Sequence, residues 1–228
     1  MKLSNETLTV LKNFGAINQG LMFKKGKTLK TVSSQKNILA EVNIAEEIPN
    51  EFGVYDLNNF LSVVSLHKDS PTFEFEEKHV LITGNSGRSQ IKYRFCSPTM
   101  ITTPPDKQFS MPDAEIKIKM SSEDFDWIMR AAAVLASPQI CIESDGNAVS
   151  LVTLDLQNDA AHSEILRLPI VGNGSKYRML FKTENMTKIL PGTYEVSISS
   201  KGISHFRNEN LPLQYWVTIE SGSTYSAE

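Results

Sequence analysis

The chain has 228 residues, of which 40% are apolar and 21% are charged, and its formal net charge is −3. This length suits one large domain or two domains of about 100 to 115 residues each. No apolar run approaches the roughly 18 residues of a transmembrane helix, and polar residues in the N-terminal stretch argue against a secretion signal. The negative balance argues against a protein that holds nucleic acid through overall positive charge.

The first half of the chain begins with a helical pattern over residues 5–17, which Ser4 or Asn5 can cap. A second helix is predicted over residues 56–67, with Asp56 as its N-cap. Lys25-Gly26 predicts a tight hairpin between the first two of six strand candidates. Those candidates are residues 20–24, 27–32, 38–44, 72–76, 79–83 and 88–96.

A proline-rich stretch follows these strands and breaks both helix and sheet patterns. Its prolines are Pro98, Pro104, Pro105 and Pro112. Spacing of this kind is typical of a linker. We therefore predict an N-terminal domain over residues 1–103, a connector over 104–113 and a C-terminal domain over 114–228.

After this linker the same order of elements returns. A strand is predicted over 115–120, a helix over 122–136 with Ser121 or Ser122 as its cap, and a short helix over 183–190. The other strand candidates are residues 139–143, 148–154, 164–170, 176–181, 193–199, 203–207 and 214–220. The repeated order predicts an α+β fold made of two similar domains.

The chain carries no recognisable catalytic or metal-binding motif. His67, His79, His162 and His205 do not share a ligand spacing, and no nucleophile elbow or phosphate-binding loop is present. Cys96 and Cys141 are isolated and are predicted to be ordinary thiols. We predict no catalytic residue, no metal and no cofactor.

Five cations lie on or next to the predicted helices; Lys12 flanks the apolar arc of helix 5–17, and the facing of Lys68 at the end of helix 56–67 is ambiguous. These cations are Lys12, Lys68, Arg130, Lys182 and Lys188. Arg130 and Lys188 lie opposite the apolar arcs of their helices, and Lys182 comes just before the last helix. Taken one at a time, each is more simply a solvated helix residue, and a cation that ends a helix also complements the helix dipole.

Several longer segments resemble one known family. The segments are MKLSNETLTVLKNFGAINQGLMFKKG at residues 1–26, LAEVNI at 39–44, YDLNNFLSVVSL at 55–66 and PGTYEVSISSKG at 191–202. They resemble the sliding clamp, or DNA polymerase processivity factor, of T-even-type phages. The resemblance runs the whole length, but it is dense in the first 65 residues or so and thin between about 70 and 170.

The resemblance implies a non-enzymatic ring. Three copies would encircle duplex DNA without sequence preference, with helices lining the hole and antiparallel sheets outside. The ring would tether the replicative DNA polymerase through that enzyme's C-terminal peptide, and an ATP-dependent clamp loader would place it on DNA. It would act in the cytoplasm of an infected bacterial host, without a membrane partner. Whether it also serves late transcription stays open.

The resemblance also gives roles to individual residues. Since topology holds a ring on DNA, weak phosphate contacts suffice, and the five helix cations become the DNA-facing candidates. Phe95 and Ile165, in strands 88–96 and 164–170, are expected at the subunit interface. Val32, Phe109 and Met111 are expected to line a partner-peptide pocket; alternatively, Phe109 and Met111 only pin the connector to the core.

Two other functions remain open at this point. One is a β-rich structural or adaptor protein of a virion, which would assemble into larger arrays. The other is a hydrolase that uses Glu74 or Glu76 with His79, because alternation places the two carboxylates on one strand face.

Overall fold

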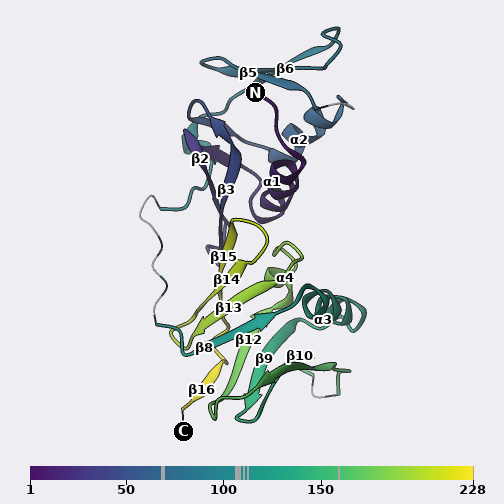
Figure 1. The fold of residues 1–228 in the computed structure, drawn as a ribbon, viewed down its shortest axis with the longest axis vertical. Coiled ribbons are helices and arrows are strands. Elements are labelled where there is room, and N and C mark those ends of the chain that lie inside the picture. The colour runs from purple at the N-terminus through teal and green to yellow at the C-terminus, as the bar shows by residue number, and fades with distance from the viewer. Residues whose placement is uncertain (68–69, 106–108, 110, 112, 159, 228) are drawn as a thin grey trace. The chain divides into compact units, whose positions relative to one another are not determined.

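The computed structural model describes the chain except residues 68–69, 106–108, 110, 112, 159 and 228. Two compact units are present, Met1–Lys107 and Gln108–Glu228 (Figure 1). Within the described residues, no helix combines the length and the apolar character that crossing a bilayer requires. The predicted α+β class with antiparallel sheets is confirmed by the strand pairs within each unit.

The first unit contains two α-helices, seven strands and a short 3-10 helix among its described residues. They are α1 (Asn5–Ile17), β1 (Leu21–Phe23), β2 (Gly26–Val32), β3 (Ile38–Ile48), β4 (Phe52–Val54), α2 (Leu57–Ser65), β5 (Thr72–Phe75), β6 (His79–Thr83), β7 (Gln90–Arg94) and η1 (Pro98–Met100).

Helix α1 begins and ends where its sequence predicts. The Ser4 hydroxyl accepts a hydrogen bond from the Thr7 amide at 3.2 Å, which satisfies one of the free amides of the first turn. Glu46 of β3 accepts from the Ser4 amide, and its other carboxylate oxygen accepts from the Thr7 hydroxyl at 2.6 Å. The buried face includes Leu11 and Phe14 and packs beside α2 and β3 (Figure 1).

The hairpin predicted at Lys25-Gly26 is wrong. Strand β1 pairs with β4, and β2 pairs with β3. Phe23 lies directly opposite Phe52 in the β1–β4 pair, and their rings stack with centroids 4.6 Å apart. A cross-strand aromatic pair of this kind stabilises that alternative pairing.

The remaining strands of this unit form the sheet β5-β6-β7. Met1 lies along β5, because its amino group donates to the Phe73 carbonyl and its own carbonyl accepts from the Phe73 amide. The edge at β5 is therefore partly covered, whereas β7 is the other edge of this sheet.

The second unit contains two α-helices and nine strands among its described residues. They are β8 (Ile116–Met120), α3 (Ser122–Val134), β9 (Gln139–Asp145), β10 (Ala148–Leu154), β11 (Ile165–Val171), β12 (Lys176–Lys182), α4 (Thr183–Met186), β13 (Tyr194–Ser199), β14 (Ile203–Asn208), β15 (Leu213–Thr218) and β16 (Thr224–Ser226). Within this unit, β15-β14-β13-β8 are neighbours in one sheet, and β11-β10-β9-β12-β16 form another.

Helix α3 starts like α1. The Ser121 hydroxyl accepts from the Asp124 amide at 3.1 Å and donates to the Asp124 carboxylate at 2.6 Å. Phe125 and Ile128 are buried and hold the helix against the unit. Phe125 packs near Tyr194 of β13, with ring centroids 6.0 Å apart.

Helix α4 is shorter than the predicted 183–190. The amides of Lys188 and Ile189 donate to carbonyls three residues earlier, so the chain tightens after Met186 instead of continuing an α-helix. The Leu190 amide donates to the Tyr215 hydroxyl at 3.2 Å, and Pro191 cannot extend a helix. Lys188 therefore lies after α4 and not within it.

Candidate functional site

Lys12 is an exposed cation on α1. The helix also carries Glu6 in its first turn, and α2 contains no charged residue. Helix α1 therefore offers one lysine that a phosphate could reach.

Arg130 is exposed on α3 beside an exposed tryptophan. Its guanidinium lies 5.8 Å from the centre of the Trp127 ring, and its Nε donates to the Asp126 carbonyl at 3.2 Å. A cation over an aromatic face is weakly stabilised there. The side chain is thus held along its own helix.

The other helix cations lie close to carboxylates. Lys182 is the last residue of β12, and its Nζ lies 4.0 Å from Glu220 Oε1. Lys188 Nζ lies 3.2 Å from Glu184 Oε1. Lys68 falls outside the described residues.

Acidic side chains outnumber cations within the described helices of both units. The acidic residues are Glu6, Glu123, Asp124, Asp126 and Glu184. A surface of this composition attracts DNA only weakly, since nearby carboxylates cancel much of the field of each cation.

Both strands predicted at the subunit interface lie at sheet edges in the described part of the chain. Strand β7 is an edge of β5-β6-β7, and β11 is an edge of the sheet that continues through β10. Ile165 begins β11 and is 61% exposed. Phe95 follows β7, and its ring stacks on Phe52 with centroids 4.5 Å apart.

Only part of strand β11 is suited to pairing with a strand of another chain. Its register with β10 shifts near Pro169, and a proline has no amide hydrogen to donate. The residues best placed to pair outward are therefore those from Ile165 to Arg167.

A hollow of about 300 Å³ lies where α3 meets the start of β11. Trp127 donates from its indole nitrogen to Glu164 at 3.2 Å, which ties the helix to the strand. Trp127 is 50% exposed and Val134 84% exposed. Sequence reasoning missed this surface, although Trp127 and Val134 are apolar residues outside the predicted core stripe of their helix.

The three peptide-pocket candidates have different environments. Val32 is buried at the end of β2 in the first unit. Phe109 is 38% exposed and packs on Trp216 of β15, with ring centroids 5.5 Å apart. Met111 is half-buried. The Phe109–Trp216 contact fits the alternative in which Phe109 pins the connector.

The residues of the hydrolase hypothesis do not form a catalytic pair. Glu74 and Glu76 are exposed, and within the described chain no hydrogen bond or ion pair joins either carboxylate to the His79 ring. No cluster of three or more His, Cys, Asp or Glu side chains in the described part could hold a metal ion. Cys96 and Cys141 are free thiols, and burial raises the pKa of Cys141 to about 12.

Comparison with known proteins agrees with the resemblance in the sequence. The family model described as DNA polymerase processivity factor matches residues 4–102. The sliding clamp of Vibrio phage KVP40 is 30% identical over 226 residues, which are 97% of this chain and 100% of that protein. The chain belongs to the sliding-clamp family. The sliding clamp of Enterobacteria phage T4 is 28% identical over 232 residues, covering 99% of each chain.

Solved clamp structures share the fold at low identity. Proliferating cellular nuclear antigen of Entamoeba histolytica is 13% identical with a TM-score of 0.70, covering 93% of this clamp and 94% of that chain. The β chain of DNA polymerase III from Streptococcus pneumoniae is 13% identical with a TM-score of 0.69, covering 97% of this clamp and 64% of that chain. The fold and the family identify the function as that of a sliding clamp and polymerase processivity factor. The alternative hypothesis of a virion adaptor is therefore not favoured.

Proposed function

We propose that three copies of this chain close into a ring around duplex DNA and hold the replicative polymerase there without catalysing a reaction. The observation that carries the proposal is an open sheet edge in each unit, β7 in the first and β11 in the second. Two different edges on one chain can pair head to tail, and such a contact generates a ring when the rotation closes.

The surface beside β11 supports this contact. Ile165, Trp127 and Val134 are all largely exposed apolar side chains. Trp127 and Val134 line the hollow beside the start of β11, and it is large enough to receive a side chain from a neighbouring copy. Burial of an isoleucine contributes about 1.5 to 3 kcal/mol. We place Ile165 at this interface and Phe95 beside the opposing edge, where its stacking on Phe52 keeps it fixed.

DNA contacts in such a ring need only be weak and independent of the base sequence. We assign these contacts first to Lys12 and Arg130, because both are exposed on helices. Lys182 and Lys188 come second, since each lies near a carboxylate. Lys68 remains a candidate from the sequence alone. A ring of this kind is retained by topology while it slides.

The partner surface is proposed near the connector over residues 104–113. The solved complex of the C-terminal region of FEN-1 with A. fulgidus PCNA, which is 17% identical to this chain with a TM-score of 0.70, illustrates peptide capture by a clamp. We propose that Val32, Phe109 and Met111 contribute to an apolar site for the polymerase C-terminal peptide. A clamp loader would open the ring, and the setting would be the cytoplasm of an infected bacterium; a role in late transcription is a secondary proposal.

Primer extension on primed circular DNA tests the proposal. The matching polymerase is run with this chain, a clamp loader and ATP, with excess competitor DNA to limit each polymerase to one binding event. We expect longer products only when chain, loader and ATP are all present. Unchanged product length in the complete reaction would overturn the proposal.

A variant pair sharpens this experiment. Ile165→Asp should abolish the longer products because it places a charge in the proposed interface. Leu156→Asp changes a residue that is 50% exposed outside the strands, and it should retain them. Equal activity of the two variants would contradict the proposed role of β11 at the subunit interface.

A further inference from the structure

Arg130 of α3 lines two different hollows of the second unit. One is the hollow of about 300 Å³ beside the start of β11, which Trp127 and Glu164 also line. The other is a groove of about 500 Å³ between α3 and the segment that follows α4, with Met129 and Ile189 among its lining residues. A single guanidinium therefore borders both the edge proposed to meet a neighbouring copy and the groove along the helix.

A chain of contacts joins this cation to the beginning of β11. The guanidinium carbon lies 5.8 Å from the centre of the Trp127 ring, and the indole nitrogen donates to Glu164 Oε1 at 3.2 Å. The Glu164 amide donates to the Thr153 hydroxyl at 2.9 Å, and the buried Thr153 returns a bond from its amide to the Glu164 carbonyl at 3.0 Å. Glu164 directly precedes Ile165, the first residue of β11. The chain of contacts thus ends on a backbone position that is fixed against β10.

The cation and the ring are accessible to different partners. Arg130 is exposed and Trp127 is 50% exposed. Asp126 also lines the groove, but the bond that it accepts from Arg130 Nε, at 3.2 Å, goes to its backbone carbonyl. A phosphate can therefore approach the guanidinium from the groove, while a neighbouring copy approaches the ring at β11.

Removal of water connects these two events. A cation beside an aromatic face is only weakly stabilised in water and gains strength when the pair is desolvated. A neighbouring copy on β11 would cover the Trp127 ring and remove water from the pair. A guanidinium that loses water favours a counter-charge, and a phosphate supplies one.

We propose that Trp127 is a positioning residue that couples closure of the ring to the DNA contact of Arg130. The inference rests on the proposed function, in which β11 pairs with a neighbouring copy and Arg130 faces DNA. The neighbour holds Trp127 against Glu164, and the fixed ring holds the guanidinium ready for a phosphate. Because coupling between two binding events is reciprocal, a phosphate on Arg130 also stabilises the subunit contact.

A double-mutant cycle on duplex binding tests the proposal. Anisotropy with a short labelled duplex at low salt measures the affinity of the full chain. Arg130→Gln should lower this affinity about fivefold in the parent and less than about twofold in a Trp127→Leu background. Lys12→Gln, on α1 of the first unit, should cost the same in both backgrounds. An equal cost of Arg130→Gln in the two backgrounds would overturn the proposal, since a Trp127 that only pins α3 to β11 predicts that result.

A conservative variant separates the ring from its hydrogen bond. Trp127→Phe keeps an aromatic face for the guanidinium but has no indole nitrogen to donate to Glu164. Most of the cost of Arg130→Gln should return in this background. A cost as small as in the Trp127→Leu background would contradict the contact between cation and ring as the link.

Fluorescence gives a direct readout of the ring. The chain has two tryptophans, and Trp216→Phe leaves Trp127 as the sole one. Its emission should move to shorter wavelength when the subunits assemble along a concentration series, and added duplex should change it again. Arg130→Gln should abolish the duplex response, and Lys12→Gln should keep it at saturating duplex. A duplex response that persists without Arg130, or that is absent in its presence, would overturn the coupling.

Light scattering on the same samples separates this inference from the proposed function. A parent that stays monomeric at every concentration would overturn both. A parent that assembles but whose Trp127 emission ignores the duplex would overturn the coupling alone and leave the ring in place.

Discussion

The N-termini of α1 and α3 satisfy the same free backbone amides in two different ways. In both helices a serine hydroxyl accepts from the amide three residues ahead, at 3.2 Å from Ser4 and 3.1 Å from Ser121. The supporting carboxylate differs. Asp124 of α3 bonds its own cap, whereas Glu46 reaches α1 from strand β3.

The carboxylate that supports the cap is therefore local in α3 and long-range in α1. Helix α3 still has a long-range contact at its start, because the Ser122 amide donates to the Thr193 hydroxyl at 3.2 Å. Apolar anchors are shared, since Phe14 and Phe125 are both buried. We infer that the first helix of each unit requires its buried phenylalanine and its serine cap. The charged residues around these two features can differ between the units.

The largest expected effect tests the shared anchors. Phe14→Ala and Phe125→Ala should each destabilise the protein by about 3 to 5 kcal/mol, because each leaves a cavity beneath a helix. Denaturant unfolding measures the change. Leu66→Ala, at a residue 70% exposed, is the control and should fall within about 0.5 kcal/mol of the parent. A large destabilisation for only one of the two phenylalanines would break the comparison.

The next effect concerns the two sheet edges. Ile165→Asp should weaken association by about 2 to 3 kcal/mol per interface, because it replaces an apolar side chain that the proposed interface would bury with a charged one. Light scattering over a dilution series measures the mass. Leu156→Asp should keep the mass of the parent, and identical profiles for the two variants would count against pairing through β11.

A smaller effect tests the long-range cap of α1. Glu46→Gln should destabilise the protein by about 1 kcal/mol at neutral pH, because a carboxylate accepts from the Ser4 amide and the Thr7 hydroxyl better than an amide side chain. Thermal unfolding measures the change. Glu47→Gln, at a neighbouring exposed carboxylate, should cost little.

The same cap has a defined pH dependence. Partial burial alone would raise the pKa of Glu46, but the hydrogen bonds from Thr7 and Ser4 outweigh it and hold the pKa below its ordinary 4.5. A lowered folded-state pKa stabilises the fold at pH values above 4.5, and this contribution disappears as the pH falls through the folded-state value. The parent should therefore lose more stability than Glu46→Gln on acidification; parallel curves would contradict the cap.

The smallest effect compares a cation on α1 with one beside α4. For duplex DNA, the plot of log binding constant against log salt concentration has a negative slope. Lys12→Gln should make this slope less steep by roughly 0.9 for each phosphate that the lysine neutralises. Lys188→Gln should change the slope less, because Glu184 lies 3.2 Å from Lys188 Nζ. Anisotropy titrations at several salt concentrations measure both, and a larger effect at Lys188 would reverse the assignment.

Local chemistry made much of the fold predictable. Ser4, Asp56 and Ser121 act as caps as their sequence contexts predict, and the apolar stripes place α1 and α3 correctly. Partner choice in sheets was less predictable, because the Phe23–Phe52 stack that favours β1–β4 joins residues far apart in the sequence. Strands β4 and β16 are only three residues long, which is too short for a periodic pattern.

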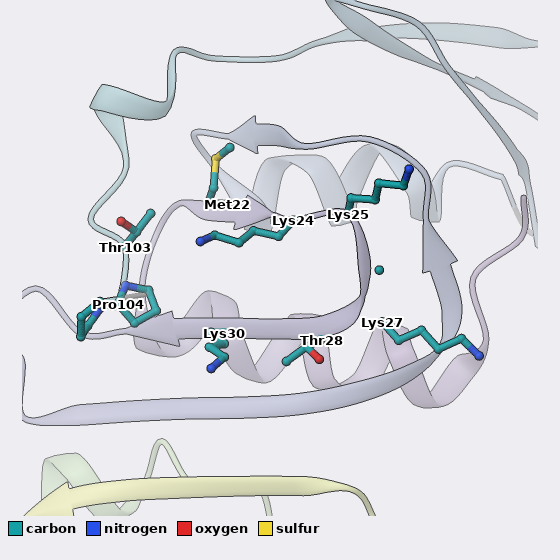
Figure 2. Close-up of a pocket in the computed structure, with 10 residues that line it drawn as sticks. Met22, Lys24, Lys25, Lys27, Thr28, Lys30, Thr103 and Pro104 are labelled. Carbon is teal, nitrogen blue, oxygen red and sulfur yellow. The ribbon is translucent and has the colours of Figure 1, made fainter. Parts of the chain in front are cut away.

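The candidate site was predictable to a smaller extent. Exposure of Lys12 and Arg130 follows from helical spacing, but the carboxylates near Lys182 and Lys188 depend on the tertiary fold and on where α4 ends. A cavity beside residues 24–30 is lined by both Met22 and Thr103, which are far apart in the sequence (Figure 2). No local sequence pattern predicts that these two residues lie close together.

Retention on circular DNA tests the central claim most directly. The chain is loaded onto a nicked circular plasmid with a clamp loader and ATP, washed at high salt, and the plasmid is then cut once. The account predicts that the protein stays with the intact circle and leaves after the cut, because only topology holds it. Equal retention on circular and linear DNA, or equal loss from both, would contradict a ring that encircles the duplex.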